Sequence, residues 1–171
     1  VWGPYYSAMV PGAWLIEGGQ SAAGAAIEKL LQFHPASVEA TEIAAKVGSS
    51  LPDWLADLAI EKSTSLSDAA RLATGMHTVP AFLGNRSPHA DPNTRAVLAG
   101  IGMESDIDNL VSFYVAGICG IGYGLRQIIS AQAEAGANIK TIVISGGAGR
   151  HPLVKQLLAD TTGIAVAAPG T

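Results

Sequence analysis

The chain of 171 residues has little of what marks several classes of protein. It contains one cysteine, Cys119, which cannot form a disulfide framework and favours a reducing compartment, so we expect a cytoplasmic protein. Only 14% of its residues are charged, and the formal net charge is -4. Neither a basic run nor an interleaving of basic and aromatic residues occurs, so we expect no nucleic-acid partner.

Long apolar runs are also missing. Residues 110–125 carry no charge, but a membrane span needs about 20 apolar residues, and this run is shorter and rich in glycine. We therefore predict a buried core helix here and no association with a membrane. The histidines share no ligand-like spacing with one another or with Cys119, so the sequence predicts no metal ligand.

What the chain does have is a pair of strand–glycine–helix junctions. Near the C-terminus, the β-branched run 141–144 predicts a buried strand, Ser145–Ala148 a tight turn, and Pro152 the start of a helix. Glycine lets a backbone come close to a ligand, and the free N–H groups of a first helical turn attract an anion. A second junction of this kind, Trp14–Ser21, lies far upstream. The two together indicate one nucleotide held between them.

Hydrophobic periodicity and turn residues predict an α/β protein that begins with a β-hairpin and ends in βαβ order. The predicted strands are residues 5–10, 13–17, 76–79, 139–145 and 164–168. The predicted helices are one that Ser21 caps and Pro35 stops, one that Pro52 opens, and residues 38–47, 67–74, 94–100, 106–135 and 152–162. Residues 80–92 are predicted to be loop because three prolines interrupt them.

The longest predicted helix, residues 106–135, shows two stripes. Apolar side chains at steps of three and four form the stripe expected to pack on a sheet. Gly117, Gly120 and Gly124 form a second stripe without side chains. Each glycine costs about 1 kcal/mol of helix propensity, so we predict that another backbone approaches the helix closely here.

The glycine turn Ser145–Ala148 has other interpretations. It could be only a tight strand-to-helix connection, since such turns are common in α/β folds without a ligand. It does not match a Rossmann dinucleotide site, because Gly147 and Gly149 are followed by Pro152 and the next strand does not end in an acidic residue. No G-x-x-x-x-G-K-[ST] motif occurs, which excludes a P-loop.

Two polar residues could carry chemistry. Ser21 lies in Gly19–Ala23, which nearly matches the G-x-S-x-G nucleophile elbow of serine hydrolases, except that Ala23 replaces the second glycine. Ser21 can equally be the N-cap of the following helix. Arg86 lies on the proline-rich loop, where a rigidly held guanidinium suits a phosphate or substrate, although a surface ion pair is the commoner role.

Three motifs occur in order: EGGQSAAGAAI at 17–27, FLGNRSP…DP…R at 82–95, and SGGA…Q…AD at 145–160. Together they resemble the C-terminal domain of FGGY carbohydrate kinases, most of all the pentulose kinases of the ribulokinase type. The resemblance implies an actin-like ATPase domain of the ribonuclease-H-like fold. It also implies that residues 1–171 are a single domain, the C-terminal ATP-binding domain of a two-domain sugar kinase, incomplete at both ends.

The resemblance implies a function and a site. Such a kinase transfers the γ-phosphoryl group of MgATP to a hydroxyl of a ketopentose such as ribulose, so the expected cofactors are ATP and Mg²⁺. By motif position, the nucleotide would lie between two groups of residues: Gly146, Gly147, Ala148 and His151 on one side, and Gly18, Gly19 and Gln20 on the other.

The same resemblance places other parts of the enzyme outside this chain. The catalytic aspartate and the family's first phosphate loop would lie upstream of Val1, so no catalytic residue is expected here. Most contacts to the sugar would come from an N-terminal domain. The sequence leaves a homodimer open. The alternatives are a non-catalytic α/β actin-like module with structural glycine turns and a serine hydrolase that uses Ser21.

Overall fold

The computed structural model describes residues 2–169. Its elements are, in chain order, β1 (Trp2–Tyr6), β2 (Trp14–Glu17), α1 (Gly24–Leu31), α2 (Ser37–Lys46), α3 (Leu51–Glu61), the 3-10 helix η1 (Asp68–Ala73), β3 (His77–Val79), β4 (Val97–Ala99), α4 (Ile107–Glu134), β5 (Thr141–Val143), the 3-10 turn η2 (Gly147–Gly149), α5 (Pro152–Thr162) and β6 (Ala165–Ala167). The predicted α/β class is confirmed.

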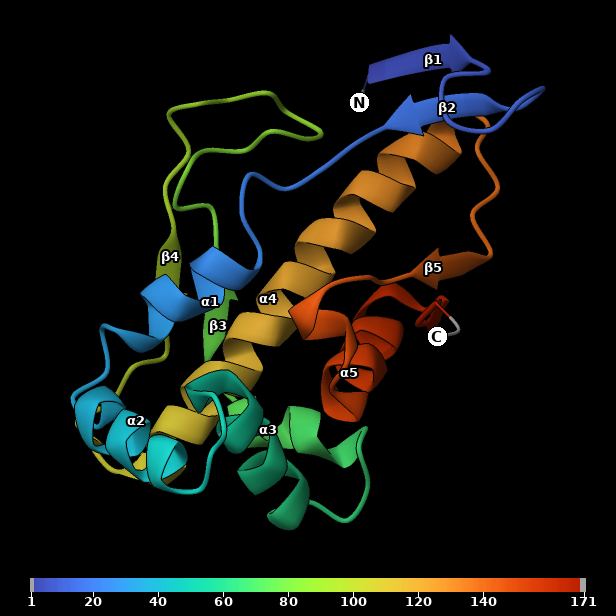
Figure 1. Ribbon diagram of the computed structural model, residues 1–171. Helices are drawn as coiled ribbons and strands as arrows, with labels where there is room; N and C mark the ends of the chain where they lie inside the picture. The colour runs from blue at the N-terminus through green and yellow to red at the C-terminus, as the bar shows by residue number, and fades with distance from the viewer. Residues whose placement is uncertain (1, 170–171) are drawn as a thin grey trace.

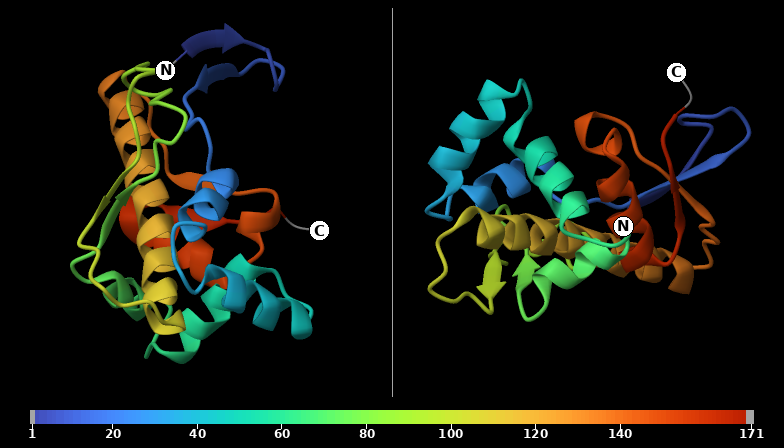
Figure 2. Two further views of the ribbon diagram at one scale, coloured as in Figure 1. Left: turned by 90° about the vertical axis from the view of Figure 1, so that its left-hand side faces the viewer. Right: turned by 90° about the horizontal axis from the view of Figure 1, so that it is seen from below.

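Helix α4 is the centre of the molecule. It runs between α1 and α5 on one face and the β3–β4 hairpin on the other (Figures 1 and 2). The helix starts at Asp106, whose Oδ1 accepts a hydrogen bond from the backbone N–H of Asn109 at 2.8 Å. Leu110 and Tyr114 of the predicted apolar stripe are buried in the core. The predicted long helix is confirmed. Within residues 2–169, no helix is long and apolar enough to cross a membrane.

The strands form three two-stranded sheets within the described residues. β1 pairs with β2 and β3 with β4, both antiparallel, whereas β5 and β6 pair in parallel, with Ile142 opposite Val166. A parallel pair needs a crossover, and α5 supplies it. Gly163 ends α5 in the left-handed conformation, with φ of 72°, as expected of a helix C-cap glycine. The predicted βαβ order at the C-terminal end is therefore confirmed.

The first strand begins and ends earlier than predicted. The hairpin is present, but β1 stops at Tyr6 and residues 7–12 form the connecting loop, so the predicted strand 5–10 is mostly wrong. Ser7 closes this loop in two ways. Its N–H donates to the carbonyl of Ala13 at 2.8 Å, and its Oγ accepts from the N–H of Gly12, also at 2.8 Å. The hydroxyl competes with strand pairing, as serine side chains do in turns.

The predicted helix over residues 94–100 is wrong, because this segment contains strand β4. Its residues pair with β3, with Thr78 opposite Leu98. A short apolar run does not distinguish strand from helix by its periodicity, so the partner strand decides. Gly100 then ends the pairing with φ of 79°, and the backbone of Gly75 lies where its Cβ would be. No side chain fits there.

The glycines of α4 give a mixed result. A Cβ on Gly120 would collide with the carbonyl oxygen of Thr78 on β3, so the predicted close approach of a backbone is confirmed there. A Cβ on Gly117 would instead meet the side chains of Ile27 and Leu30, and one on Gly124 would meet the side chain of Gln20. For these two positions the prediction is wrong, because side chains fill the groove.

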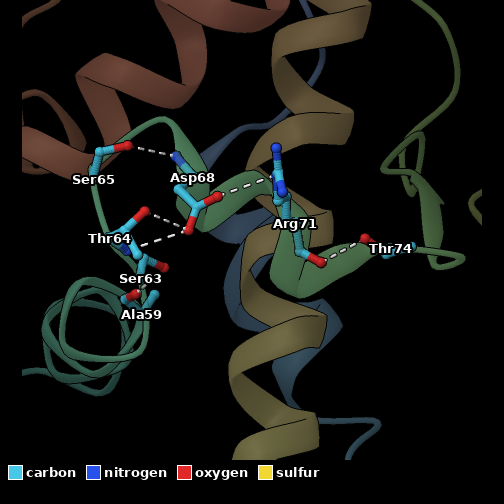
Figure 3. A network of polar contacts seen from close by, with 7 residues as sticks. All are labelled: Ala59, Ser63, Thr64, Ser65, Asp68, Arg71 and Thr74. Carbon is cyan, nitrogen blue, oxygen red and sulfur yellow. Dashed lines mark hydrogen bonds and ion pairs between the residues drawn. The ribbon is translucent and has the colours of Figure 1, made fainter.

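A polar network ties α3 to η1 (Figure 3). Asp68 Oδ2 accepts from the N–H of Thr64 at 3.2 Å and from its hydroxyl at 3.0 Å, and Asp68 Oδ1 pairs with Arg71 Nε at 3.1 Å. The hydrogen bonds from Thr64 hold the pKa of Asp68 below its ordinary value. The predicted short helix 67–74 is therefore a 3-10 helix, anchored by its first aspartate.

Candidate functional site

The upstream junction links β2 to α1 through Gly18, Gly19 and Gln20. The side chain of Gln20 donates to the carbonyl of Ile121 on α4 at 2.6 Å. The N–H of Gly19 donates to Ser87 Oγ on the proline-rich loop at 3.3 Å. The junction is therefore held between α4 and a loop that is distant in the sequence.

Arg86 lies against this junction. Its Nη2 is 2.6 Å from Glu17 Oε1, and its guanidinium lies 5.0 Å from the ring centroid of Trp2. A Cβ on Gly19 would be 3.9 Å from Arg86 Nη1. The structure thus brings Arg86 together with Gly19. The guanidinium is half exposed and already engaged by a carboxylate and an aromatic ring.

A cavity of about 460 Å³ opens beside the same junction. Its polar wall comes from four parts of the chain, namely Gln20, Thr78, Arg86 and Gln127 among others. The Ser145–Gly149 turn does not line it. Of the two junctions, therefore, only the upstream one contributes to this cavity.

Ser21 does not cap α1. The helix begins at Gly24 with Ala23 in the N-cap position, and no side chain caps it. The hydroxyl of Ser21 donates instead to the carbonyl of Gly84 at 3.2 Å, which ties the junction to the proline-rich loop. The predicted N-cap is wrong, because a tertiary hydrogen bond takes the hydroxyl. A nucleophilic serine needs a general base at its hydroxyl, and here the hydroxyl faces a carbonyl.

The downstream junction follows β5. Gly146 has φ of 89°, a conformation that favours glycine, and Gly149 packs against Ile144. Gly147 is different: its φ is not in the left-handed region, and a Cβ there would meet nothing within 4 Å. Neither backbone geometry nor packing explains why Gly147 is glycine. The side chain of Ala148 lies outside the described part of the chain.

His151 is the N-cap of α5. Its Nδ1 accepts from the N–H of Leu153 at 3.3 Å, and its Nε2 lies 3.1 Å from Asp57 Oδ1 on α3. The imidazole is largely buried, whereas Asp57 is mostly exposed. His151 therefore joins the downstream junction to α3.

The downstream junction lies on the same side of α4 as α1, the helix that follows the upstream junction. The Ser145–Gly149 turn, orange in Figure 1, lies on the side of α4 that also carries α1 and α5 (Figures 1 and 2). Within residues 2–169 no hydrogen bond joins the upstream junction to the turn.

Sequence reasoning missed Gly24. This glycine is the first residue of α1, its φ is not in the left-handed region, and a Cβ on it would meet nothing within 4 Å. It shares with Gly147 the property of being a glycine that the fold does not require. The signal was present, because Gly24 is the third glycine of the EGGQSAAG motif.

Other chemistries find no support. Burial, together with the charge of Asp160, raises the pKa of the Cys119 thiol to about 11, so this thiol is not a nucleophile near neutral pH. Within residues 2–169, no three histidine, cysteine or acidic side chains lie where they could hold a metal ion.

The architecture has solved counterparts. The chain superimposes on a xylulose kinase from Bifidobacterium adolescentis with a TM-score of 0.54 and 28% identity, covering 74% of this chain and 23% of that one. It superimposes on Plasmodium falciparum glycerol kinase with ADP with a TM-score of 0.61 and 20% identity, covering 88% and 26%. These sugar and glycerol kinases have the actin-like ATPase fold, which is therefore the fold of this chain.

Over residues 1–171 the sequence matches the FGGY family of carbohydrate kinases, C-terminal domain, and the chain belongs to this family. It is 41% identical over 170 residues to an FGGY carbohydrate kinase domain-containing protein of Homo sapiens, covering 97% of this chain and 30% of the relative. It is 35% identical over 171 residues to a D-ribulokinase of Saccharomyces cerevisiae, covering 99% and 24%. The chain thus spans less than a third of the length of these relatives.

Proposed function

We propose that this chain is the ATP-binding part of a carbohydrate kinase that transfers the γ-phosphoryl group of MgATP to a hydroxyl of a ketopentose such as ribulose. The observation that carries the proposal is the turn after β5. Gly147 is a glycine without a structural reason in the free chain, in the position where a nucleotide would need close access to backbone. Gly24, the first residue of α1 after the upstream junction, is likewise a glycine without a structural reason.

The proposed nucleotide site combines the two junctions. Gly146, Gly147 and Ala148 would face the nucleotide with their backbone, and His151 would follow them. Gly18, Gly19 and Gln20 would approach from the other side. The ADP-bound state of the glycerol kinase with the same fold supports a nucleotide ligand for this fold.

Arg86 is the cation nearest the upstream junction. It could bind a phosphate only if its ion pair with Glu17 opened, since the two atoms are 2.6 Å apart. We therefore propose that the main role of Arg86 is structural, namely to hold the proline-rich loop against β2.

The rest of the reaction needs groups beyond this chain. Phosphoryl transfer requires positioned Mg²⁺, a base or orienting residue for the acceptor hydroxyl, and a clamp on the phosphates. We propose that an N-terminal domain supplies the catalytic aspartate, the first phosphate loop and most contacts to the sugar. A ketopentose is favoured because a D-ribulokinase is a relative and a xylulose kinase has a similar structure.

The test is MgATP-dependent stabilisation of the whole protein, followed by a coupled ADP-release assay with a panel of ketopentoses. A ligand at 100 times its Kd stabilises the folded state by about 2.7 kcal/mol, so we expect a clear rise in Tm. No rise at millimolar MgATP would favour the non-catalytic actin-like module. Labelling of Ser21 by a fluorophosphonate would favour the serine hydrolase, and we expect none.

A further inference from the structure

His151 uses both ring nitrogens inside the protein. Nδ1 accepts from the N–H of Leu153, so it carries no proton. The proton is therefore on Nε2, which donates to Asp57 Oδ1 at 3.1 Å. One neutral tautomer satisfies both contacts, and the side chain is only 11% exposed. No ring nitrogen is left for a ligand.

The position of His151 makes it an anchor for the glycine turn. A Cβ on Gly147 would meet nothing within 4 Å. The turn is closed by two backbone hydrogen bonds, from the N–H of Gly149 to the carbonyl of Gly146 at 3.2 Å and from the N–H of Arg150 to the carbonyl of Gly147 at 3.1 Å. His151 comes next, and its imidazole reaches across to α3. Pro152 has no N–H, so the Leu153 amide that His151 binds is the first free donor of α5.

We propose that His151 and Asp57 form a positioning pair that fixes the glycine turn against α3, and that the imidazole supports the turn and does not bind the nucleotide. The proposal rests on the proposed function, because that function makes a nucleotide the ligand of the glycine turn. Asp57 lies in none of the motifs that define the junctions, and only the fold brings it to His151. Its role is to accept one hydrogen bond.

The first test replaces the acceptor in the whole protein. One hydrogen bond contributes about 0.5–1.5 kcal/mol, so Asp57→Ala should raise the KM for MgATP roughly twofold to twelvefold, with kcat changed less. Asp57→Asn keeps an oxygen that accepts from Nε2 and should restore the KM to within about twofold of the wild type. Asp57 is 64% exposed, so neither variant disturbs the core. Glu61→Ala removes an exposed carboxylate from the same helix and is the control.

The second test separates positioning from direct contact. Asparagine at position 151 can still cap α5, but it is too short to reach Asp57, so His151→Asn should match Asp57→Ala. The double variant should lose no more than either single one, because the two residues act as a pair. A raised KM in His151→Asn with an unchanged KM in Asp57→Ala would overturn the proposal in favour of direct contact. Absence of any MgATP binding by the wild type would instead overturn the proposed function, and this proposal with it.

Discussion

At the scale of the residue, Gly147 and Gly149 make a matched pair, because they are two positions apart and have opposite surroundings. Gly147 has open space where a Cβ would lie, whereas a Cβ on Gly149 would be 2.9 Å from the carbonyl oxygen of Ile144. We expect Gly147→Val to fold with a nearly unchanged Tm and to weaken ATP binding by more than about 1 kcal/mol, since its side chain takes the space of the ligand. Isothermal titration with MgATP and a thermal melt measure both effects.

The control for this prediction is Gly149→Val. Its side chain would collide with backbone, so we expect a lowered Tm whatever happens to the ligand. An unchanged ATP affinity in folded Gly147→Val would mean that the turn is only a strand-to-helix connection.

At the scale of the element, the neighbours of the α4 glycines predict how much an added methyl group costs in stability. A methyl group on Gly120 would meet the backbone carbonyl of Thr78, which pairs in a sheet and cannot move freely. A methyl group on Gly124 would meet the end of the Gln20 side chain, with Nε2 at 2.7 Å. We expect Gly120→Ala to destabilise the protein by roughly 1–3 kcal/mol, the usual cost of overpacking. In Gly124→Ala, a gain of about 1 kcal/mol in helix propensity should offset much of the strain.

Urea denaturation followed by circular dichroism compares the two variants. Equal destabilisation would show that the neighbour's mobility does not decide the cost. Gly124→Ala should also loosen the upstream junction, because the hydrogen bond from Gln20 to Ile121 must shift.

At the scale of the whole molecule, the exposed β1–β2 hairpin and the catalytic groups assigned to another domain predict that residues 1–171 have no kinase activity by themselves. Tyr6 and Trp14 on the β1–β2 hairpin are 61% and 64% exposed, and an exposed sheet edge favours pairing with another strand. In the kinase that we propose, the base and the first phosphate loop belong to another domain. Because phosphoryl transfer depends on positioning and electrostatic stabilisation by such parts, we expect no sugar-dependent ADP release from residues 1–171 alone. The whole protein should turn over a ketopentose in the same coupled assay.

The coupled assay compares residues 1–171 with the whole protein, and two outcomes would contradict the expectation. Turnover by residues 1–171 at the rate of the whole protein would show that the catalytic centre lies within this chain. Inactivity of both would count against the kinase proposal itself.

Features that depend on neighbouring residues in sequence were predictable. The apolar spacing and Asp106 define α4, Pro52 marks the start of α3, and Gly163 ends α5. Each is a local interaction, so it is the same in any fold that contains the segment. The ordered glycine motifs likewise predicted the fold and the family, and both are confirmed.

Only the tertiary structure decided which of these segments contact one another. Residues 97–99 are a strand because β3 lies beside them. Ser21 does not cap the helix because its hydroxyl donates a hydrogen bond to a carbonyl on the proline-rich loop. The pairing of His151 with Asp57 joins residues far apart in the chain, and no local pattern marks Asp57. Such contacts are set by which elements pack together, and a single sequence does not display that packing. The sequence by itself therefore determined the family and most of the helices, whereas the strand at 97–99, the start of α1 and the partners of the site residues were decided by the fold.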